Sequence, residues 1–378
     1  MGYKDAERVF KKVKSLQEAI AIGNVYDPYN NNTTDDVRVD LWGQLKQLIA
    51  VPSCEGTFIL REALDRKQQI EIILTTVIDL LRNPNKTNLH CHHNDDDINN
   101  MMSDIWLNSN DYIDQMIGNT NEQIDKSLVL SKVRWITLGY QYDWTSRTYN
   151  RENYVPFPVA LGRLCKELTA SIYEQSGFTL DPEAAIVNFY QNGSIMGGHQ
   201  DDAEKTTDHP VISISIGCPC IFLLGGNNKE ETPLPILLRS GDVLFMGGPS
   251  RLRYHGVPKI FISEGPPLYL QPPSISDNEN IHYYTCPVFL EINDVSDDDE
   301  NNNNDDNTDS LEKEETDDDA LPRKRLRTNK SSCTCGGTNK NEICRALKYL
   351  QITRINLNVR QVYSSDDNHC DRRNIIGT

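Results

Sequence analysis

The sequence predicts an α+β fold, with a two-sheet barrel or jelly roll that follows a mainly helical N-terminal region. Short runs rich in aliphatic, aromatic and β-branched residues recur from residue 131 onward, and such runs are typical of strands. Paired glycines such as Gly197-Gly198, Gly225-Gly226 and Gly247-Gly248 separate them. Many short strands joined by glycine-rich turns indicate a sandwich or barrel, whose mouth is a natural ligand pocket.

The expected elements of this β region can be placed from their composition. A helix is expected at 159–175, closed by Gly177, and a short helix at 341–350 should return the chain to its last strand. The expected strands are 134–144, 184–190, 211–216, 220–224, 234–239, 242–246 and 353–362.

Residues 1–130 show helical spacing in three places. A short, basic amphipathic stretch covers 7–16. The spacing of Leu41, Leu45, Leu48 and Ile49 predicts a second helix across 40–51. The clearest pattern is 67–81, where aliphatic residues recur at three- and four-residue intervals until Asn83-Pro84 ends the helix. The run 56–60 is predicted to be a strand that leads into it.

The charge of the chain is concentrated in one segment. Fourteen acidic residues and one lysine lie between Asp294 and Asp319, so this segment carries −13 of the net charge of −17 and leaves −4 for the rest. With so few apolar residues it cannot offset the entropy of ordering. We therefore expect 294–340 to be a disordered insertion in a core formed by 131–293 and 341–363, with 364–378 as a tail.

The remaining charge of −4 removes most of the argument against a polyanionic partner, without supplying a basic patch that would argue for one. The cluster P-R-K-R-L-R at 322–327 is of the kind that nuclear import receptors recognise. The alternative is that it is a counter-charge to the acidic run. We expect the nucleus, with the mitochondrion and cytoplasm left open by the basic N-terminal stretch.

The cysteines and histidines outside the core pattern predict little. The ten cysteines are scattered, and no secretory signal or membrane-length apolar run is present, so a reducing intracellular compartment is expected. The ligand candidates His90, Cys91, His92 and His93 are adjacent in sequence, which suits a tetrahedral site poorly and favours a polar loop. Cys333, Cys335 and Cys344 lack the second pair of a structural zinc site and are expected to be free thiols.

The central candidate for chemistry is an H-x-D pair, His199 and Asp201, with His255 downstream. Two imidazoles and one carboxylate on one face of an iron, with the opposite face open, are typical of non-heme Fe(II) oxygenases. An isolated H-x-D pair is a weak pattern, since a long chain carries one by chance. The surrounding sequence gives it weight.

The last predicted strand has a polar face. Side chains two apart share a face of a strand, so Arg354, Asn356, Asn358 and Arg360 lie on one side and the aliphatic residues between them on the other. Polar residues facing the inside of a barrel are costly without an anionic guest, and guanidinium groups pair with carboxylates. An edge strand with its polar face in water is the alternative.

Four motifs in sequence order resemble the AlkB family of Fe(II)- and 2-oxoglutarate-dependent nucleic-acid dioxygenases. The resemblance runs from about Arg134 to Val362, except for the insertion, and is closest to the eukaryotic branch that contains AlkB homologue 1. The motif residues are Asn188 and Tyr190 (N-x-Y), His199 and Asp201 (H-x-D), Ser250, Arg251, Leu252 and His255 (S-R-L-x-x-H), and Arg354, Asn356 and Arg360 (R-x-N-x-x-x-R).

This resemblance implies a double-stranded β-helix (jelly-roll) core and a role for each matching residue. His199, Asp201 and His255 would hold Fe(II). Arg354 would bind the iron-proximal carboxylate of 2-oxoglutarate and Arg360 the distal one. The implied remaining contacts are Asn188, Tyr190 and Asn356 for hydrogen bonds to the cosubstrate, Tyr140, Gln141 and Tyr142 in a substrate-contacting lid, and Lys229 near the nucleic acid.

The implied activity is oxidative demethylation of N-methylated bases, with release of formaldehyde, succinate and CO2. One departure limits the substrate: the bacterial pattern has an acid two residues after the metal-binding Asp, where this chain has Ala203. This departure leaves methylated adenine or cytosine in tRNA and N6-methyladenine in DNA open. From the resemblance to the branch we favour tRNA, with DNA next, and expect a monomer that does not act at a membrane. The alternatives are a dioxygenase for a methylated protein such as a histone tail, and a nucleic-acid-binding module that has lost catalysis.

Overall fold

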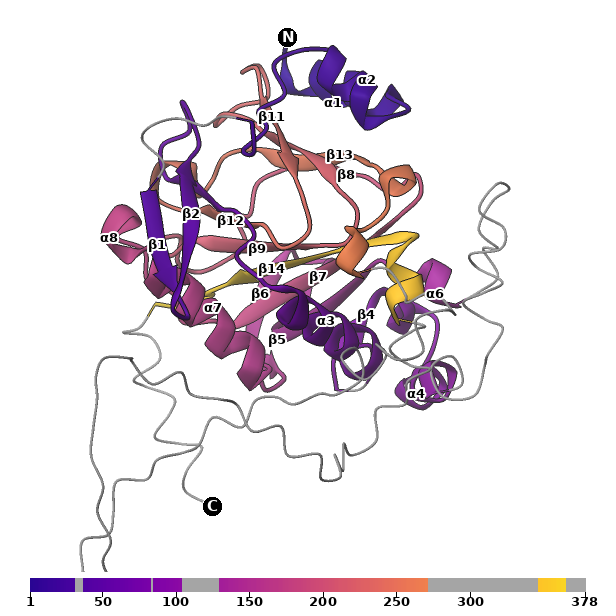
Figure 1. Ribbon diagram of the computed structural model, residues 1–378. Helices are drawn as coiled ribbons and strands as arrows, with labels where there is room; N and C mark the ends of the chain where they lie inside the picture. Colours follow the sequence, from indigo (N-terminus) through magenta and orange to yellow (C-terminus); the bar gives the residue numbers. More distant parts are fainter. Residues whose placement is uncertain (31–36, 83, 104–128, 271–345, 365–378) are drawn as a thin grey trace, which may run out of the picture.

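The computed structural model describes residues 1–30, 37–82, 84–103, 129–270 and 346–364, and the structural statements below concern these residues. Two antiparallel sheets face each other across an apolar core (Figure 1). The ten-stranded sheet has the order β1-β2-β3-β12-β9-β14-β7-β5-β4, with β6 paired to β5. The four-stranded sheet has the order β11-β10-β13-β8. This is the jelly-roll type of α+β architecture that the sequence predicts.

The predicted strands of the β region are confirmed. β14 lies between β7 and β9, so the alternative of an edge strand for 353–362 is wrong. The strands of the large sheet are β1 (Val37–Leu41), β2 (Gln44–Ala50), β3 (Thr57–Leu60), β4 (Lys86–Thr87), β5 (Trp135–Asp143), β6 (Thr148–Tyr154), β7 (Ala184–Gln191), β9 (Val211–Ile216), β12 (Val243–Met246) and β14 (Thr353–Arg360). Those of the small sheet are β8 (Met196–His199), β10 (Cys220–Leu224), β11 (Leu234–Leu238) and β13 (His255–Ile260).

Helices cover the outer faces of both sheets (Figure 1). On the large sheet, α3 (Arg66–Leu74), the π-helix Thr75–Asp79 and α7 (Val159–Ser171) bury aliphatic side chains in the main core. On the small sheet lie α1 (Tyr3–Lys12) and α2 (Leu16–Ala21). The other helices are α4 (Asp95–Ser103), α6 (Val129–Lys132), α8 (Tyr173–Ser176), the 3-10 helices Asn88–Cys91, Gly248–Ser250, Ile262–Glu264 and Leu268–Leu270, and residues 346–350.

The two longest predicted helices are confirmed in position. A capping box between Asp65 and Gln68 starts α3, and such a box satisfies two backbone donors that the first turn leaves free. The helix predicted at 159–175 is formed by α7 and α8, and Gly177 closes it in the left-handed conformation at φ +67°. Within the described ranges, no helix has the length and apolarity needed to cross a bilayer.

The helix predicted across 40–51 is wrong, because these residues form the β1–β2 hairpin. Leu41 pairs with Gln44 across a two-residue turn, and Trp42 and Gly43 in that turn both have positive φ, at 55° and 73°. A tight hairpin of this kind requires two such residues. Leu45, which completed the helical stripe in the sequence, is 64% exposed.

The described part of 1–130 therefore mixes helices with strands. β1, β2 and β3 extend the large sheet through the pairing of β3 with β12, and β3 confirms the strand predicted at 56–60. A mainly helical N-terminal region is therefore not shown: α1 to α4 are helices, but β1 to β4 lie among them. The predicted insertion at 294–340, its basic cluster, Cys333, Cys335, Cys344 and the tail from residue 365 onward lie outside the described residues.

Gly139 tests the geometry of the large sheet. It has φ +70°, and an added Cβ would overlap the carbonyl oxygen of Glu183. We expect Gly139→Ala to lower the free energy of unfolding by more than about 2 kcal/mol, because backbone strain and overlap add. The control is Gly177→Ala, with φ +67° and open space around the new methyl, which should cost about 1 kcal/mol. Equal losses in urea unfolding would contradict this account.

Candidate metal and cosubstrate site

A cavity of about 320 Å³ lies between the two sheets. Both sheets contribute to its wall, so the residues that face it come from segments far apart in the sequence. The residues that matter below are Tyr142, Trp144, Arg147, Asn188, Tyr190, His199, Asp201, Ser213, His255, Arg354, Asn356, Asn358 and Arg360.

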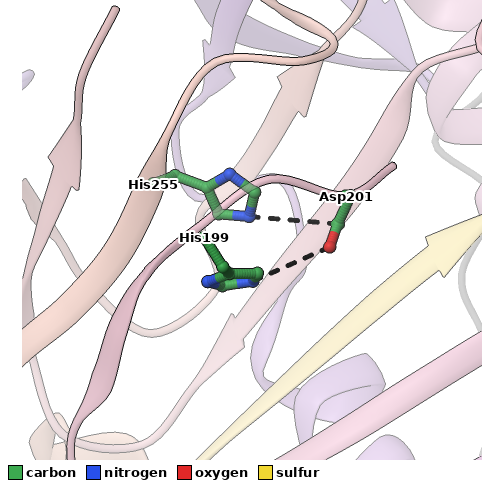
Figure 2. A group of neighbouring side chains, drawn as sticks. All are labelled: His199, Asp201 and His255. Atoms are coloured by element: carbon green, nitrogen blue, oxygen red, sulfur yellow. Dashed lines mark ion pairs between the residues drawn. The ribbon is translucent and has the colours of Figure 1, made fainter. Parts of the chain in front are cut away.

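His199, Asp201 and His255 meet at this cavity (Figure 2). His199 ends β8 and His255 begins β13, and the two are directly paired across the strands. Their Nε2 atoms lie 3.7 Å and 3.9 Å from the two carboxylate oxygens of Asp201. One ligand atom from each of the three lies within 4.8 Å of the others. The spacing suits one metal ion bound by all three.

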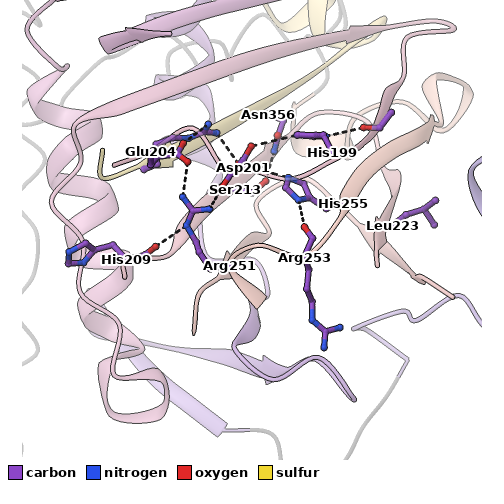
Figure 3. Close-up of polar contacts among 12 residues, drawn as sticks. His199, Asp201, Glu204, His209, Ser213, Leu223, Arg251, Arg253, His255 and Asn356 are labelled. Atoms are coloured by element: carbon purple, nitrogen blue, oxygen red, sulfur yellow. Dashed lines mark hydrogen bonds and ion pairs between the residues drawn. The ribbon is translucent and has the colours of Figure 1, made fainter. Parts of the chain in front are cut away.

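Both imidazoles are held in the tautomer that a metal needs (Figure 3). Nδ1 of His199 lies 3.0 Å from the carbonyl of Gly197, and Nδ1 of His255 lies 3.0 Å from the carbonyl of Arg253. An N–H donated to these carbonyls leaves the Nε2 lone pair directed at Asp201. Burial and the neighbouring His199 lower the pKa of His255 to about 4, so His255 is neutral near pH 7.

Asp201 is held as a carboxylate by its surroundings. Burial alone would raise the pKa of Asp201, but Arg360, together with the imidazoles once they are protonated at low pH, outweighs burial and holds this pKa well below its usual range. Nη2 of Arg360 lies 3.3 Å from Oδ2. Arg251 donates from Nη1 to the backbone carbonyl of Asp201 at 2.6 Å, which fixes the main chain that carries the carboxylate.

Glu204 is a site residue that the sequence reasoning missed. Its side chain is fully buried and accepts from Arg251 at 3.0 Å and from Arg360 at 3.2 Å (Figure 3). The signal in the sequence was a third acid shortly after Asp201, in a chain with two motif arginines to be neutralised. Since both of its carboxylate oxygens are engaged by arginines, Glu204 is not free to contact a substrate.

Arg354 is the buried cation without a counter-charge. It is 1% exposed and donates to the carbonyl of Cys218 and to Oγ of Ser215, each at 2.7 Å. Across the described ranges it has no carboxylate partner, and its Nε lacks any hydrogen bond. A buried guanidinium is costly without an anion, so the cavity beside Arg354 fits a carboxylate.

The predicted partners of that carboxylate surround Arg354. In the β14–β7 pairing, Arg354 is opposite Tyr190 and Asn356 is opposite Asn188, and all four line the cavity. Asn356 donates to Oγ of Ser213 at 2.8 Å and to the carbonyl of Ile214 at 3.0 Å. Within the described residues, its amide oxygen and the Asn188 amide form no hydrogen bond with the protein and face the cavity, where a ligand can meet them.

The contacts of the two β14 arginines favour roles opposite to those that the sequence predicted for them. Arg360, predicted at the distal carboxylate of 2-oxoglutarate, contacts the metal ligand Asp201. Arg354, predicted at the iron-proximal carboxylate, is six residues away, which is roughly 20 Å along a strand. The distal carboxylate therefore fits Arg354, and the proximal role fits Arg360.

Of the four residues predicted to contact substrate, only Tyr142 lines the cavity. The Gln141 amide is buried and donates to the carbonyl of Gly139 at 2.9 Å, because alternate side chains of β5 point to opposite faces. The Tyr140 ring packs on Tyr363 with centroids 4.8 Å apart. The Lys229 ammonium lies over the ring of Tyr254, outside the cavity-lining set.

The histidines at 90–93 form no second metal centre within the ranges described. His90 Nε2 lies 3.2 Å from Asp95, and Lys86 Nζ lies 2.9 Å from the same carboxylate. In these ranges the group formed by His199, Asp201 and His255 is the one set of three or more ligand-type side chains close enough to hold an ion.

The chain belongs to the 2OG-Fe(II) oxygenase superfamily, whose family model matches residues 93–360. Fe(II) and 2-oxoglutarate are therefore its cofactor and cosubstrate, and the triad and Arg354 fit them. Among similar proteins is the DNA N(6)-methyladenine demethylase ALKBH1A of Arabidopsis thaliana, 31% identical over 69% of this chain and 82% of its own. The tRNA demethylase abh1 of Schizosaccharomyces pombe is 35% identical over 57% and 71%. The human nucleic acid dioxygenase ALKBH1 is 36% identical over 50% and 47%. These relatives place the chain in the AlkB family, in its AlkB homologue 1 branch.

Loss of one imidazole tests the metal site. We expect His255→Ala to weaken Mn(II) binding at least about 100-fold, since changes to outer partners of a metal ligand already cost 10- to 100-fold. Isothermal titration of the full chain with Mn(II) measures this. His209→Ala is the control, because its ring is half-buried, lies outside the set of cavity-lining residues and contacts Thr179. A similar loss in both variants would contradict the site.

Proposed function

We propose that this protein is an Fe(II)- and 2-oxoglutarate-dependent dioxygenase that removes N-methyl groups from bases in nucleic acid, with tRNA favoured over DNA. The observation that carries the proposal is one cavity that joins the metal triad, an uncompensated buried arginine and an aromatic mouth. The relatives support the substrate class, since their names describe demethylases of DNA and tRNA and a nucleic acid dioxygenase.

The residues divide the work along the cavity. His199, Asp201 and His255 would hold the metal, and iron held by two imidazoles and one carboxylate supplies oxygenase chemistry. Arg354 would pair with the distal carboxylate of 2-oxoglutarate, and Arg360 would hold Asp201 and meet the proximal end. When bound, iron and 2-oxoglutarate supply the oxidation of the N-methyl group by O2, with release of succinate, CO2 and formaldehyde.

The mouth of the cavity suits a flat base. Tyr142 and Trp144 meet edge to face with centroids 4.8 Å apart, and Trp135 lies 4.9 Å from Trp144. Trp144 is 47% exposed, and exposed aromatic rings stack on unpaired bases. Arg147 also lines the cavity, at the turn between β5 and β6 with φ 54°. Its cation is placed to meet a phosphate that flanks the base.

The acids that follow Asp201 support a substrate other than the alkylated DNA bases of the bacterial pattern. Ala203 stands where that pattern has an acid, and the next acid, Glu204, is occupied by Arg251 and Arg360. A methylated adenine or cytosine of tRNA, or N6-methyladenine of DNA, fits this cavity without such an acid. We also infer a nuclear location from the basic cluster at 322–327, which a fluorescent fusion with its arginines changed to alanine would test.

The substrate class is tested by formaldehyde release. Purified protein with Fe(II), ascorbate and 2-oxoglutarate is given a tRNA stem-loop with one methylated adenine, a DNA strand with N6-methyladenine, both unmethylated counterparts and a methylated histone-tail peptide. We expect formaldehyde from the methylated RNA first, then from the DNA, and none from the peptide or from His199→Ala. Turnover of the peptide alone would replace nucleic acid by protein as the substrate. Consumption of 2-oxoglutarate without formaldehyde from any oligonucleotide would overturn the proposal.

Two cavity-lining arginines, Arg354 and Arg147, should differ in their effect on the binding of 2-oxoglutarate. Arg354→Lys keeps the charge but loses the two-pronged contact, and we expect the Kd of 2-oxoglutarate to rise at least about tenfold, as for loss of a charge-assisted hydrogen bond. Arg147→Lys is the matched control at the mouth and should leave this Kd unchanged. Anaerobic titration of the Fe(II) protein, followed by its visible absorption, measures both. A larger rise of this Kd in Arg147→Lys than in Arg354→Lys would contradict the assignment of the distal carboxylate to Arg354.

A further inference from the structure

Tyr3 fills a slot behind the metal site that is made of three glycines. The ring is 1% exposed, and its hydroxyl donates to the carbonyl of Leu223 at 3.3 Å. A Cβ added to Gly198 would overlap the ring, one on Gly225 would lie 2.7 Å from it, and one on Gly256 would lie 2.9 Å from its hydroxyl. The Tyr3 ring thus occupies space that the Cβ of any other residue at the three glycine positions would need.

Two of these glycines are chain neighbours of the metal-ligand histidines. Gly198 precedes His199 in β8, and Gly256 follows His255 in β13. Successive residues of a strand face opposite sides of the sheet. The imidazoles therefore face the cavity while the glycines face outward, where α1 packs on β8 and β13. Tyr3 contacts the back of both histidine-bearing strands at once.

β8 has few backbone partners among the described residues. It has four residues, lies at the edge of the small sheet and, within the described part of the chain, pairs with β13 alone. The pairing is irregular between His255 and Val257. A short edge strand with an irregular ladder has few backbone hydrogen bonds to fix its distance from its neighbour, so packing from outside sets that distance.

We propose that Tyr3 is a positioning residue for the metal centre: its ring, held in the slot of Gly198, Gly225 and Gly256, sets the separation of the strands that carry His199 and His255. Tyr3 does not touch the metal or the cosubstrate. It acts through the backbone of β8 and β13, and the inference concerns metal affinity, so it is independent of which nucleic acid is the substrate.

Mn(II) titration of the full chain tests the proposal without turnover. We expect Tyr3→Ala to weaken Mn(II) binding about 10- to 100-fold, the range for groups that orient metal ligands. Tyr3→Phe keeps the ring and loses only the bond to Leu223, so it should bind within about twofold of wild type. Phe10→Ala is the matched control: Phe10 is on the same helix, equally buried and in the same apolar cluster, but the three atoms nearest to a Cβ added at Gly198, Gly225 or Gly256 do not include any of its atoms.

All variants are measured well below their thermal midpoints, so that unfolding does not enter the affinity. The proposal requires that Tyr3→Ala lose metal affinity while Phe10→Ala, with a similar fall in Tm, stays within about threefold of wild type. If the two variants lose affinity equally, α1 acts only by stabilising the fold and the proposal is overturned. If neither loses affinity, it is overturned as well.

A second glycine variant distinguishes a steric slot from general packing. Gly198→Ala adds a methyl that overlaps the Tyr3 ring, so it should weaken Mn(II) binding in the wild-type background. In Tyr3→Ala that methyl has room, so the double variant should bind no worse than Tyr3→Ala alone. Such non-additivity identifies a direct contact. Strictly additive losses would overturn the slot as the means by which Tyr3 acts.

Discussion

The site depends on a set of buried charges that nearly balance one another. Arg251, Arg360, Glu204 and Asp201 are connected by contacts of 2.6 to 3.3 Å. These four come from β14, from the residue after the 3-10 helix Gly248–Ser250, and from the loop after β8, so their pairing fixes three distant segments at one point. Removing one member would leave a buried charge uncompensated. The free-energy cost of such a charge exceeds the net stabilisation that the intact pair provides. The network therefore specifies where Asp201 stands.

Arg354 differs from these arginines because it has no carboxylate partner in the described residues, and this unmatched charge suits the cavity to an anionic ligand. Every other motif cation at this site has a carboxylate within reach, whereas Arg354 has only neutral acceptors in the described structure. β14 can carry such a residue because its other face packs Ile355, Leu357 and Val359 into the main core. The apolar face holds the strand at the centre of the sheet, and the polar face then presents the unmatched charge to a ligand.

What the sequence predicted well was set by local periodicity or by motif order. Strands β7, β9, β10, β11, β12 and β14 follow from short β-branched runs and glycine turns, whereas β8 and β13, which carry the two histidines, were not predicted. The alternation of β14 correctly placed Arg354, Asn356 and Arg360 on one face. The grouping of His199 with His255 required the resemblance, because no spacing rule pairs residues 56 positions apart. Their cross-strand pairing in the structure explains why that distance is irrelevant.

The errors have specific physical causes. Leu41, Leu45 and Leu48 fit a helix, but the Trp42-Gly43 turn overrode the periodicity, since positive φ at both residues directs the chain into a hairpin. Gln141 was grouped with its neighbours Tyr140 and Tyr142, although a strand turns alternate side chains away from each other. The contacts favour the reverse of the order predicted for Arg354 and Arg360, because the approach of Asp201 to Arg360 depends on Glu204 and Arg251, which no local pattern reveals.

The metal site is assembled from both ends of the chain. β3 pairs with β12, and Ser250, between the arginine network and β12, receives a hydrogen bond from Thr57 of β3 at 2.7 Å. On the opposite side of the small sheet, Tyr3 packs behind His199 and His255. The N-terminal region is thus bound to the core at two places that border the ligands, one through β3 and one through α1. Its role is to complete the walls of the jelly roll, because β3 gives β12 its second strand neighbour and α1 covers the outer face of β8 and β13.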